Sequence, residues 1–187
     1  MTCFVVCGMP RTGTSLTMGI LQKMGVHTGP TRTGANNPDY YESQLLLDYI
    51  NQKSGVKAED VIKSISEGHE DCWGLKHPSV IAYWNELGAL IDDPRFIVCH
   101  RRDKEAQYMS HFNSIRRQDR ESFDKRDRDY YANADRISSH HTAIHVTYED
   151  WFDEVARNRQ LLILSKFCGL EITDEAIQLI DPDLKHY

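Results

Sequence analysis

The feature that most limits the fold of this chain is an apolar run followed at once by a glycine-rich loop and a helical pattern. Residues 2–7 read TCFVVC, which is typical of a buried strand in a parallel sheet. Gly8 and Gly13 enclose the loop MPRT, and residues 14–25 carry apolar side chains at helical spacing. Such a strand, loop and helix favour anion binding, because backbone N–H groups of the loop and of the first helical turn point at the ligand.

The loop departs from a nucleotide phosphate loop at one position. A Walker-type loop has Lys and then Ser or Thr after its second glycine, whereas Thr14 and Ser15 follow Gly13 here. A cation, Arg11, lies inside the loop instead, and its planar guanidinium suits bidentate contacts to an oxyanion. Thr12, Thr14 and Ser15 add hydroxyl donors. No convincing strand-terminal Asp follows to hold Mg²⁺, so we expect a metal-free anion site neutralised by cations.

The rest of the chain alternates predicted strands and helices. Strands are expected at 71–78, at 94–101 and within 142–150. Helices are expected at 42–55, 57–68, 79–91, 103–117, 150–169 and 173–180, with a solvated, charge-alternating helix face at 118–129 and a long loop at 26–41. This order predicts an α/β fold of three layers, P-loop NTPase-like, with a central parallel sheet of about four to five strands. We expect one domain over 1–187.

Four polar motifs fall at the ends of predicted strands. They are the glycine loop, KHP at 76–78, RRD at 101–103 and YED at 148–150. In open parallel sheets, ligands bind at the carboxyl ends of the strands. The four motifs are therefore expected to meet at one edge of the sheet.

Composition narrows the class of protein. Lys and Arg number 22 against 28 Asp and Glu, a net charge of −6, which argues against a general nucleic-acid binder. The five cysteines form no CxxC pair, and Cys3, Cys7 and Cys99 lie in apolar runs, as buried thiols of a reducing compartment do. We find neither a signal peptide nor an apolar stretch near the roughly 20 residues that cross a bilayer, and expect a cytoplasmic protein. No ligand spacing around His140, His141 and His145 indicates a metal site.

The segment GMPRTGTSL after a strand resembles the 5′-phosphosulfate loop of the sulfotransferase family. That family transfers a sulfuryl group from 3′-phosphoadenosine 5′-phosphosulfate (PAPS) without a metal, with Lys or Arg at the position of Arg11. The resemblance runs from about residue 3 to residue 170, because 146–170 is also similar to the family's late strand, YED-type turn and long helix. One departure is the missing late RKG segment, for which Lys185 or His186 would be a weak substitute.

The resemblance also implies residues for the rest of the co-substrate. The family binds the 3′-phosphate with an Arg at a strand end and a Ser eight positions later, which here are Arg102 and Ser110. Arg101 is the alternative if the register shifts by one residue. Tyr148 would lie near the adenine, where an aromatic ring can stack on the base, although a core tyrosine at a strand end explains it equally well.

For the chemistry, the resemblance and the residue types together indicate cations and a base. Arg11 and Lys76 are the expected cations, which stabilise charge on the transferring group. The base is Glu42, by resemblance to NPxGYFE-like segments, or His77, which has a suitable intrinsic pKa. The expected acceptor is a hydroxyl or amine of a small molecule or carbohydrate; the oligomeric state stays open. The alternatives are a P-loop small-molecule or nucleotide kinase using Mg-ATP, and a nucleotide-binding protein without turnover.

Overall fold

The computed structural model describes residues 2–30, 41–53, 55–68, 71–114 and 118–180. Its centre is one sheet of four parallel strands in the order β2-β1-β3-β4. The strands are β1 (Thr2–Cys7), β2 (Cys72–Lys76), β3 (Pro94–His100) and β4 (Thr142–Thr147). The α/β class, the parallel sheet and its strand number are as the sequence predicts.

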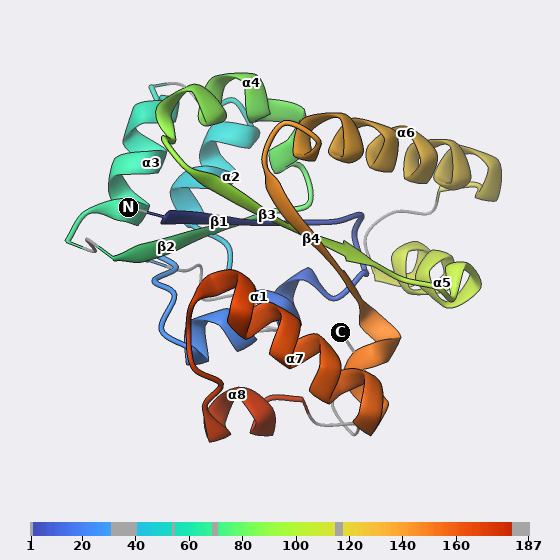
Figure 1. The fold of residues 1–187 in the computed structure, drawn as a ribbon. Coiled ribbons are helices and arrows are strands. Elements are labelled where there is room, and N and C mark those ends of the chain that lie inside the picture. Colours follow the sequence, from blue (N-terminus) through green and yellow to red (C-terminus); the bar gives the residue numbers. More distant parts are fainter. Residues whose placement is uncertain (1, 31–40, 54, 69–70, 115–117, 181–187) are drawn as a thin grey trace.

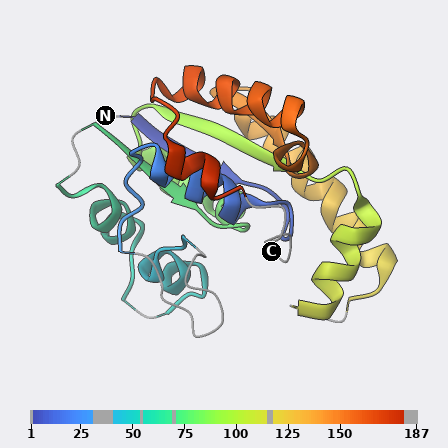
Figure 2. The ribbon, with the colours of Figure 1, turned by 90° about the horizontal axis from the view of Figure 1, so that it is seen from below.

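Helices cover both faces of the sheet and make three layers (Figures 1 and 2). One face packs against α2 (Gln44–Ile50), α3 (Ala58–Ser66), η1 (Val80–Tyr83), α4 (Trp84–Leu87) and α6 (Arg120–Ser138). The other face packs against α1 (Thr14–Lys23), α7 (Glu154–Cys168) and α8 (Asp174–Gln178). Helix α5 (Lys104–Ser114) lies at the end of the sheet where β3 stops (Figure 1).

The apolar run of β1 is continuous because the strand is buried on both sides. Cys3, Val5 and Cys7 belong to the core with α2, α3 and α6. Phe4 and Val6 belong to the opposite core, with α1 and α7. All five side chains are inaccessible to solvent, which is the pattern of a central parallel strand. Cys3, Cys7 and Cys99 are buried free thiols, as expected.

The single helix predicted at 79–91 is wrong. The segment forms η1, the single turn α4 and η2 (Gly88–Leu90) in succession. Gly88 ends α4 and packs under the indole of Trp84, where a Cβ atom would lie 2.6 Å from Cε2 of the ring. The close contact explains why this position is a glycine, and glycine weakens a helix, which agrees with the interruption here.

Two other helices differ from the expectation in their bounds. The charged segment 118–129 is part of α6, which continues to Ser138 and buries Phe123, Ala134 and Ile137 at helical spacing. This helix is therefore half embedded rather than only a solvated face. Helix α7 begins at Glu154, not at 150, because Tyr148–Phe152 form the turn η3. The side chain of Asp153 caps α7 by accepting a hydrogen bond from the Ala156 N–H.

The strand order reverses between β1 and β3, and this reversal fixes where a ligand can bind. The chain runs from β1 outward to β2 and then crosses back to β3 on the other side of β1. Such a switch point leaves a crevice at the carboxyl ends of the two central strands. The glycine loop follows β1 there, and Arg101 follows β3. Within the described ranges, no helix has the length and apolar character needed to cross a membrane.

Candidate active site at the carboxyl edge of the sheet

The loop between β1 and α1 depends on two residues in the left-handed region. Gly13, which precedes α1, has φ 82°, and Arg11 has φ 70°. Strained non-glycine residues of this kind concentrate at functional sites. A Cβ atom on Gly13 would lie 2.6 Å from Cδ2 of Tyr148, so a glycine at this position also lets the Tyr148 ring pack against the loop.

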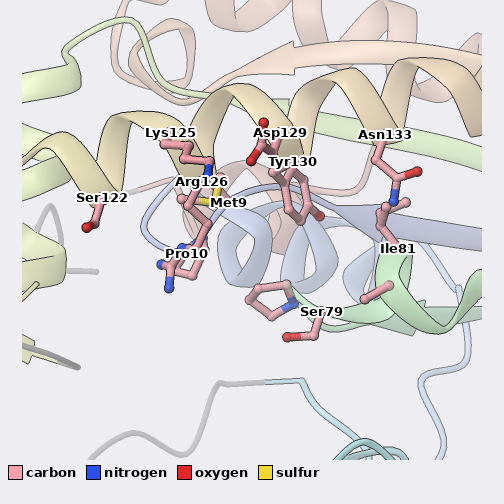
Figure 3. A pocket seen from close by; sticks show the side chains of 12 residues that line it. Met9, Pro10, Ser79, Ile81, Ser122, Lys125, Arg126, Asp129, Tyr130 and Asn133 are labelled. Atoms are coloured by element: carbon pink, nitrogen blue, oxygen red, sulfur yellow. The ribbon is translucent and has the colours of Figure 1, made fainter.

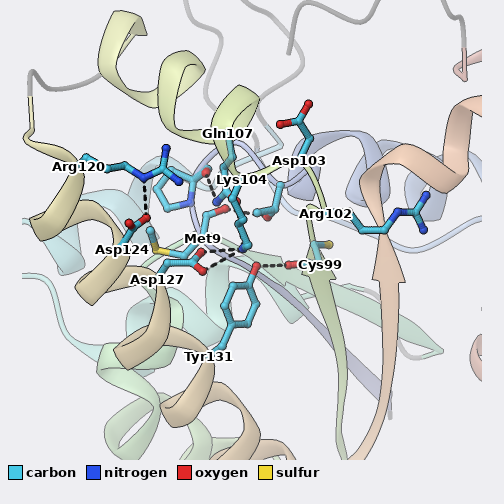
Figure 4. A network of polar contacts seen from close by, with 12 residues as sticks. Met9, Cys99, Arg102, Asp103, Lys104, Gln107, Arg120, Asp124, Asp127 and Tyr131 are labelled. Carbon is cyan, nitrogen blue, oxygen red and sulfur yellow. Dashed lines mark hydrogen bonds and ion pairs between the residues drawn. The ribbon is translucent and has the colours of Figure 1, made fainter.

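Side chains hold the loop carbonyls in place. Three successive carbonyls of the loop accept hydrogen bonds from side chains. Thr12 Oγ1 donates to the Met9 carbonyl at 2.7 Å, and Gln107 Nε2 donates to the Pro10 carbonyl at 3.2 Å. Arg101 Nη1 donates to the Arg11 carbonyl at 3.1 Å. Gln107 is itself held by Lys104, which pairs with Asp127 of α6 (Figure 4). With the carbonyls engaged by protein groups, the N–H groups of the first turn of α1, which lack intrahelical partners, are what the loop offers an anion.

Helix α6 supports the same loop from the other side. The Tyr130 hydroxyl accepts a hydrogen bond from the Gly8 N–H at 2.8 Å, and the Tyr131 hydroxyl donates to the Cys99 carbonyl at 2.7 Å. Gly8 is close to its neighbours, since a Cβ atom there would lie 2.7 Å from the Cys99 carbonyl oxygen. The loop is thus fixed between β3 and α6.

Lys76, the last residue of β2, brings a cation and a carboxylate to the loop. Its ammonium donates to Oγ of Ser15 at 3.0 Å and to Oε1 of Glu42 at 2.7 Å. Only 3% of Lys76 is exposed. Burial lowers the pKa of Lys76, and the Glu42 carboxylate opposes that shift because it stabilises the ammonium form. The predicted meeting of KHP with the glycine loop is therefore seen in the contact of Lys76 with Ser15, and Glu42 joins them there.

His77 lies beside this group and has a defined hydrogen bond. Its Nδ1 accepts from the Ser79 N–H at 2.9 Å, so the neutral ring carries its proton on Nε2. Burial lowers the pKa of His77, while Glu42 raises it and Lys76 lowers it. The neutral ring therefore offers a donor at Nε2 rather than a free basic nitrogen.

Arg11 contacts the helix that follows β3. Its Nε donates to Oγ of Ser110 at 2.7 Å. Arg102, the predicted partner of Ser110, instead forms an ion pair with Asp150 at 2.6 Å, and 63% of its side chain is exposed. The structure places Arg102 and Ser110 at the same edge of the sheet, but each contacts another residue.

Arg101 and Tyr148 are packed together on the loop. The guanidinium of Arg101 lies 4.7 Å from the centre of the Tyr148 ring, within range of a cation–π contact. Nε of Arg101 is buried and makes no hydrogen bond to the described residues. Glu149 accepts hydrogen bonds from the N–H groups of Arg102 and Asp103 at 3.1 and 3.0 Å. Burial raises the pKa of Glu149, but those bonds and Arg101 bring it below its usual value.

The contributions of α5 and α6 to the loop were not predicted from the sequence. Gln107, Tyr130 and Tyr131 fix the loop, and none of them belongs to a recognisable motif. One signal was present, since Phe123, Tyr130, Ala134 and Ile137 repeat at helical spacing within and beyond the charged segment. That spacing indicates a helix with one embedded face.

Some of the predicted positions lie outside the described residues. These are Lys185, His186 and most of the loop 26–41. Among the residues that the structure does describe, no group of three or more His, Cys, Asp or Glu side chains is arranged to hold a metal ion.

Comparisons with known proteins point to one family. The sequence model described as "Sulfotransferase domain" matches residues 4–178. Among solved structures, the chain is similar to a sulfotransferase from Mycobacterium tuberculosis, with 17% identity and a TM-score of 0.49 over 97% of this chain and 71% of that one. The search of curated proteins gave no match.

Proposed function

The chain belongs to the sulfotransferase domain family, and from this premise we propose that it transfers a sulfuryl group from PAPS to a hydroxyl or amine of an acceptor. The proposal extends over residues 1–187 as one domain. In it, PAPS supplies a sulfuryl group on a phosphate that departs as 3′-phosphoadenosine 5′-phosphate.

The observation that carries this proposal is the position of Lys76. A buried ammonium contacts both a hydroxyl of the first turn of α1 and the Glu42 carboxylate. The loop itself has no lysine after Gly13, so Lys76 supplies from β2 a cation that the loop lacks. A cation, a carboxylate and a helix N-terminus at one point suit the transfer of an anionic group to a hydroxyl.

The residues present fit the co-substrate. The end of the loop at Gly13, with Thr14 and Ser15, offers N–H groups and hydroxyls to the phosphosulfate, and Arg11 adds a guanidinium. Nε of Arg101 is buried without a hydrogen bond to the described residues, and the Glu149 carboxylate lies 4.0 Å from it, so this donor has room for a closer anion. We keep Arg102 and Ser110 as ligands of the 3′-phosphate and Tyr148 as a residue near the adenine.

We propose Glu42 as the base and Arg11 and Lys76 as the neutralising cations, with no metal. The acceptor oxygen forms a bond to sulfur as the bond between sulfur and the bridging oxygen breaks, and the electron pair of that bond leaves with the phosphate. The acceptor proton goes to the Glu42 carboxylate. His77 is the weaker candidate because its Nδ1 already accepts the Ser79 N–H, so Nε2 carries the proton. We assign it a donor role toward a developing negative charge.

A calorimetric titration with 3′-phosphoadenosine 5′-phosphate, alongside ATP with and without Mg²⁺, tests the proposal. The bisphosphate is expected to bind without metal, and at 100 times its Kd to stabilise the fold by about 2.7 kcal/mol. Binding of Mg-ATP alone would replace the proposal with a kinase. Bisphosphate binding without transfer of ³⁵S from labelled PAPS to any of a broad set of hydroxyl and amine acceptors would support a nucleotide-binding protein without turnover.

A further inference from the structure

A cavity of about 470 Å³ lies beside the glycine loop, between that loop, the start of η1 and helix α6. Its volume is in the range of small-molecule sites, about 300–1,000 Å³. Figure 3 shows Tyr130 and Arg126 projecting from α6 toward the loop and Ser79, with Asn133 above Ile81. The cavity therefore has one wall from α6 and one from the two segments that carry the proposed chemistry.

We propose that this cavity binds the acceptor, and that the acceptor is a ring-bearing alcohol with an anionic substituent. The inference rests on the proposed function and deepens it. Met9 and Pro10 line the cavity and directly precede Arg11. Pro78 and Ser79 also line it and directly follow Lys76 and His77. A molecule in the cavity thus lies against both chain segments that carry the expected cations.

The apolar part of the lining favours an acceptor with an apolar ring. Met9, Pro10, Pro78 and Ile81 contribute hydrocarbon surface, and Tyr130 contributes its ring. Tyr130 is itself fixed, because its hydroxyl accepts from the Gly8 N–H. Rigid apolar walls and an aromatic ring favour a flat or cyclic ligand over a flexible polar one. A free monosaccharide, with hydroxyls around its whole edge, would leave polar groups facing these walls.

The charged part of the lining selects the substituent. Lys125, Arg126 and Asp129 line the cavity from α6, with a net charge of one positive unit. Lys125 is exposed and forms no ion pair within the described part of the chain. Nη2 of Arg126 lies 3.1 Å from Nε2 of His111, which holds this guanidinium in place. An anion on the acceptor would face Lys125 and Arg126, while Asp129 can accept a hydrogen bond from a hydroxyl.

The test uses two matched ligands and two matched pairs of variants. Naphthol and hydroxynaphthoate differ only by a carboxylate, and N-acetylglucosamine serves as the carbohydrate. Ala82→Trp fills the cavity, and Ala89→Trp places the same side chain on an exposed turn that does not line it. Lys125→Gln removes a lining charge, and Arg128→Gln removes an exposed charge of α6 that lies outside the lining. Binding of each ligand is measured by calorimetry with and without saturating 3′-phosphoadenosine 5′-phosphate.

The expected pattern separates this inference from the proposed function. The wild type should bind hydroxynaphthoate about fivefold more tightly than naphthol, the size of one exposed ion pair, and Lys125→Gln should reduce that preference, leaving only the part due to Arg126. Ala82→Trp should weaken both aromatic ligands by about tenfold or more while the bisphosphate Kd stays unchanged. Ala89→Trp and Arg128→Gln should match the wild type.

Three results would overturn the inference. The first is equal binding of hydroxynaphthoate to the wild type and Ala82→Trp, with bisphosphate binding intact. The second is a preference for N-acetylglucosamine or for naphthol. Both leave the proposed function standing. The third is failure of the wild type to bind the bisphosphate, which would overturn the proposed function and the acceptor assignment together. Lys125→Gln keeps the test decisive if Ala82→Trp does not fold, because Lys125 is an exposed position on α6.

Discussion

The ammonium of Lys76 lies 2.7 Å from the carboxylate of Glu42, although 34 positions separate the two residues in the chain. The pair is nearly enclosed, with 2% of the Lys76 side chain and 13% of the Glu42 side chain exposed. Removing one partner would leave the other charged and poorly solvated. Glu42 therefore favours the charged form of Lys76 at the point where α1 begins.

Glu42→Gln is expected to lower kcat by about 100-fold or more, the usual contribution of a general base. It should also move the alkaline limb of the kcat/KM profile to lower pH. The alkaline limb reports the loss of the Lys76 charge as pH rises. Because Glu42 raises the pKa of Lys76, removing the Glu42 carboxylate lets burial lower the pKa of Lys76 further. A pH profile from about 6 to 11, covering the reference pKa of lysine, measures both effects.

Asp48→Asn is the matched control for that experiment. Asp48 also pairs with a lysine, since its Oδ1 lies 2.7 Å from Nζ of Lys53, but the pair is on the exposed side of α2. This variant should keep the wild-type kcat and pH profile. A Glu42→Gln enzyme with an unchanged kcat would remove Glu42 from the chemistry and return the base role to His77.

Arg102→Ala should weaken binding of 3′-phosphoadenosine 5′-phosphate by about 10-fold to 100-fold, as expected for lost charge-assisted hydrogen bonds. Its free energy of unfolding should change by no more than about 0.5 kcal/mol, because the side chain is exposed and, within the described part of the chain, its ion pair is with Asp150 alone. Calorimetry and urea unfolding give the two quantities. Wild-type affinity in Arg102→Ala would rule this residue out as a 3′-phosphate ligand.

Arg101→Ala should behave differently from its neighbour. Arg101 donates to the Arg11 carbonyl and packs on the Tyr148 ring, so its loss removes a support of the loop. We expect a loss of about 1–3 kcal/mol in unfolding free energy together with weaker bisphosphate binding. If Arg101→Ala lost affinity with no loss of stability, Arg101 would be a ligand in the shifted register rather than a support.

The loop and the sheet were predictable from the sequence because their signals are local. A buried strand, two glycines with fixed spacing and a helix follow one another within residues 2–25. The convergence of Lys76 and Ser15 was also predictable, because parallel strands present their carboxyl ends at one edge. These inferences need only chain order and strand direction.

The supports of the loop were not predictable in this way because they are tertiary contacts. Tyr130 reaches Gly8 across 122 positions, from a helix whose first half reads as a solvated charged face. The Arg11 side chain points toward Ser110 because the backbone at Arg11 is left-handed. A left-handed backbone cannot be predicted from the sequence at a residue other than glycine. Tertiary packing decides both.

Tyr130→Phe tests whether the hydroxyl on Gly8 positions the loop. The buried Gly8 N–H would lose its acceptor, at a cost of about 1–3 kcal/mol in unfolding free energy. Affinity for the bisphosphate and kcat should both fall. In Tyr83→Phe the lost hydroxyl donates to the Ile50 carbonyl at the end of α2 and not to the glycine loop, so stability should fall while affinity and kcat stay at wild-type values. Equal kinetics in the two variants would reduce Tyr130 to a packing role.

Gly13→Ala is expected to destabilise the fold and abolish tight binding of the bisphosphate. Gly55→Ala separates the cost of a left-handed backbone from the cost of the clash with Tyr148. Both glycines have left-handed backbone, with φ 82° and 90°, which costs an alanine about 1–2 kcal/mol. At Gly55 no described residue has an atom within 4 Å of an added Cβ, so only this backbone cost remains. At Gly13 the Cβ would lie 2.6 Å from the Tyr148 ring, which adds about 1–3 kcal/mol of overpacking and pushes the ring or the loop away. Urea unfolding and bisphosphate calorimetry measure the difference. Equal losses in the two variants would show that the Tyr148 ring does not constrain the loop in solution.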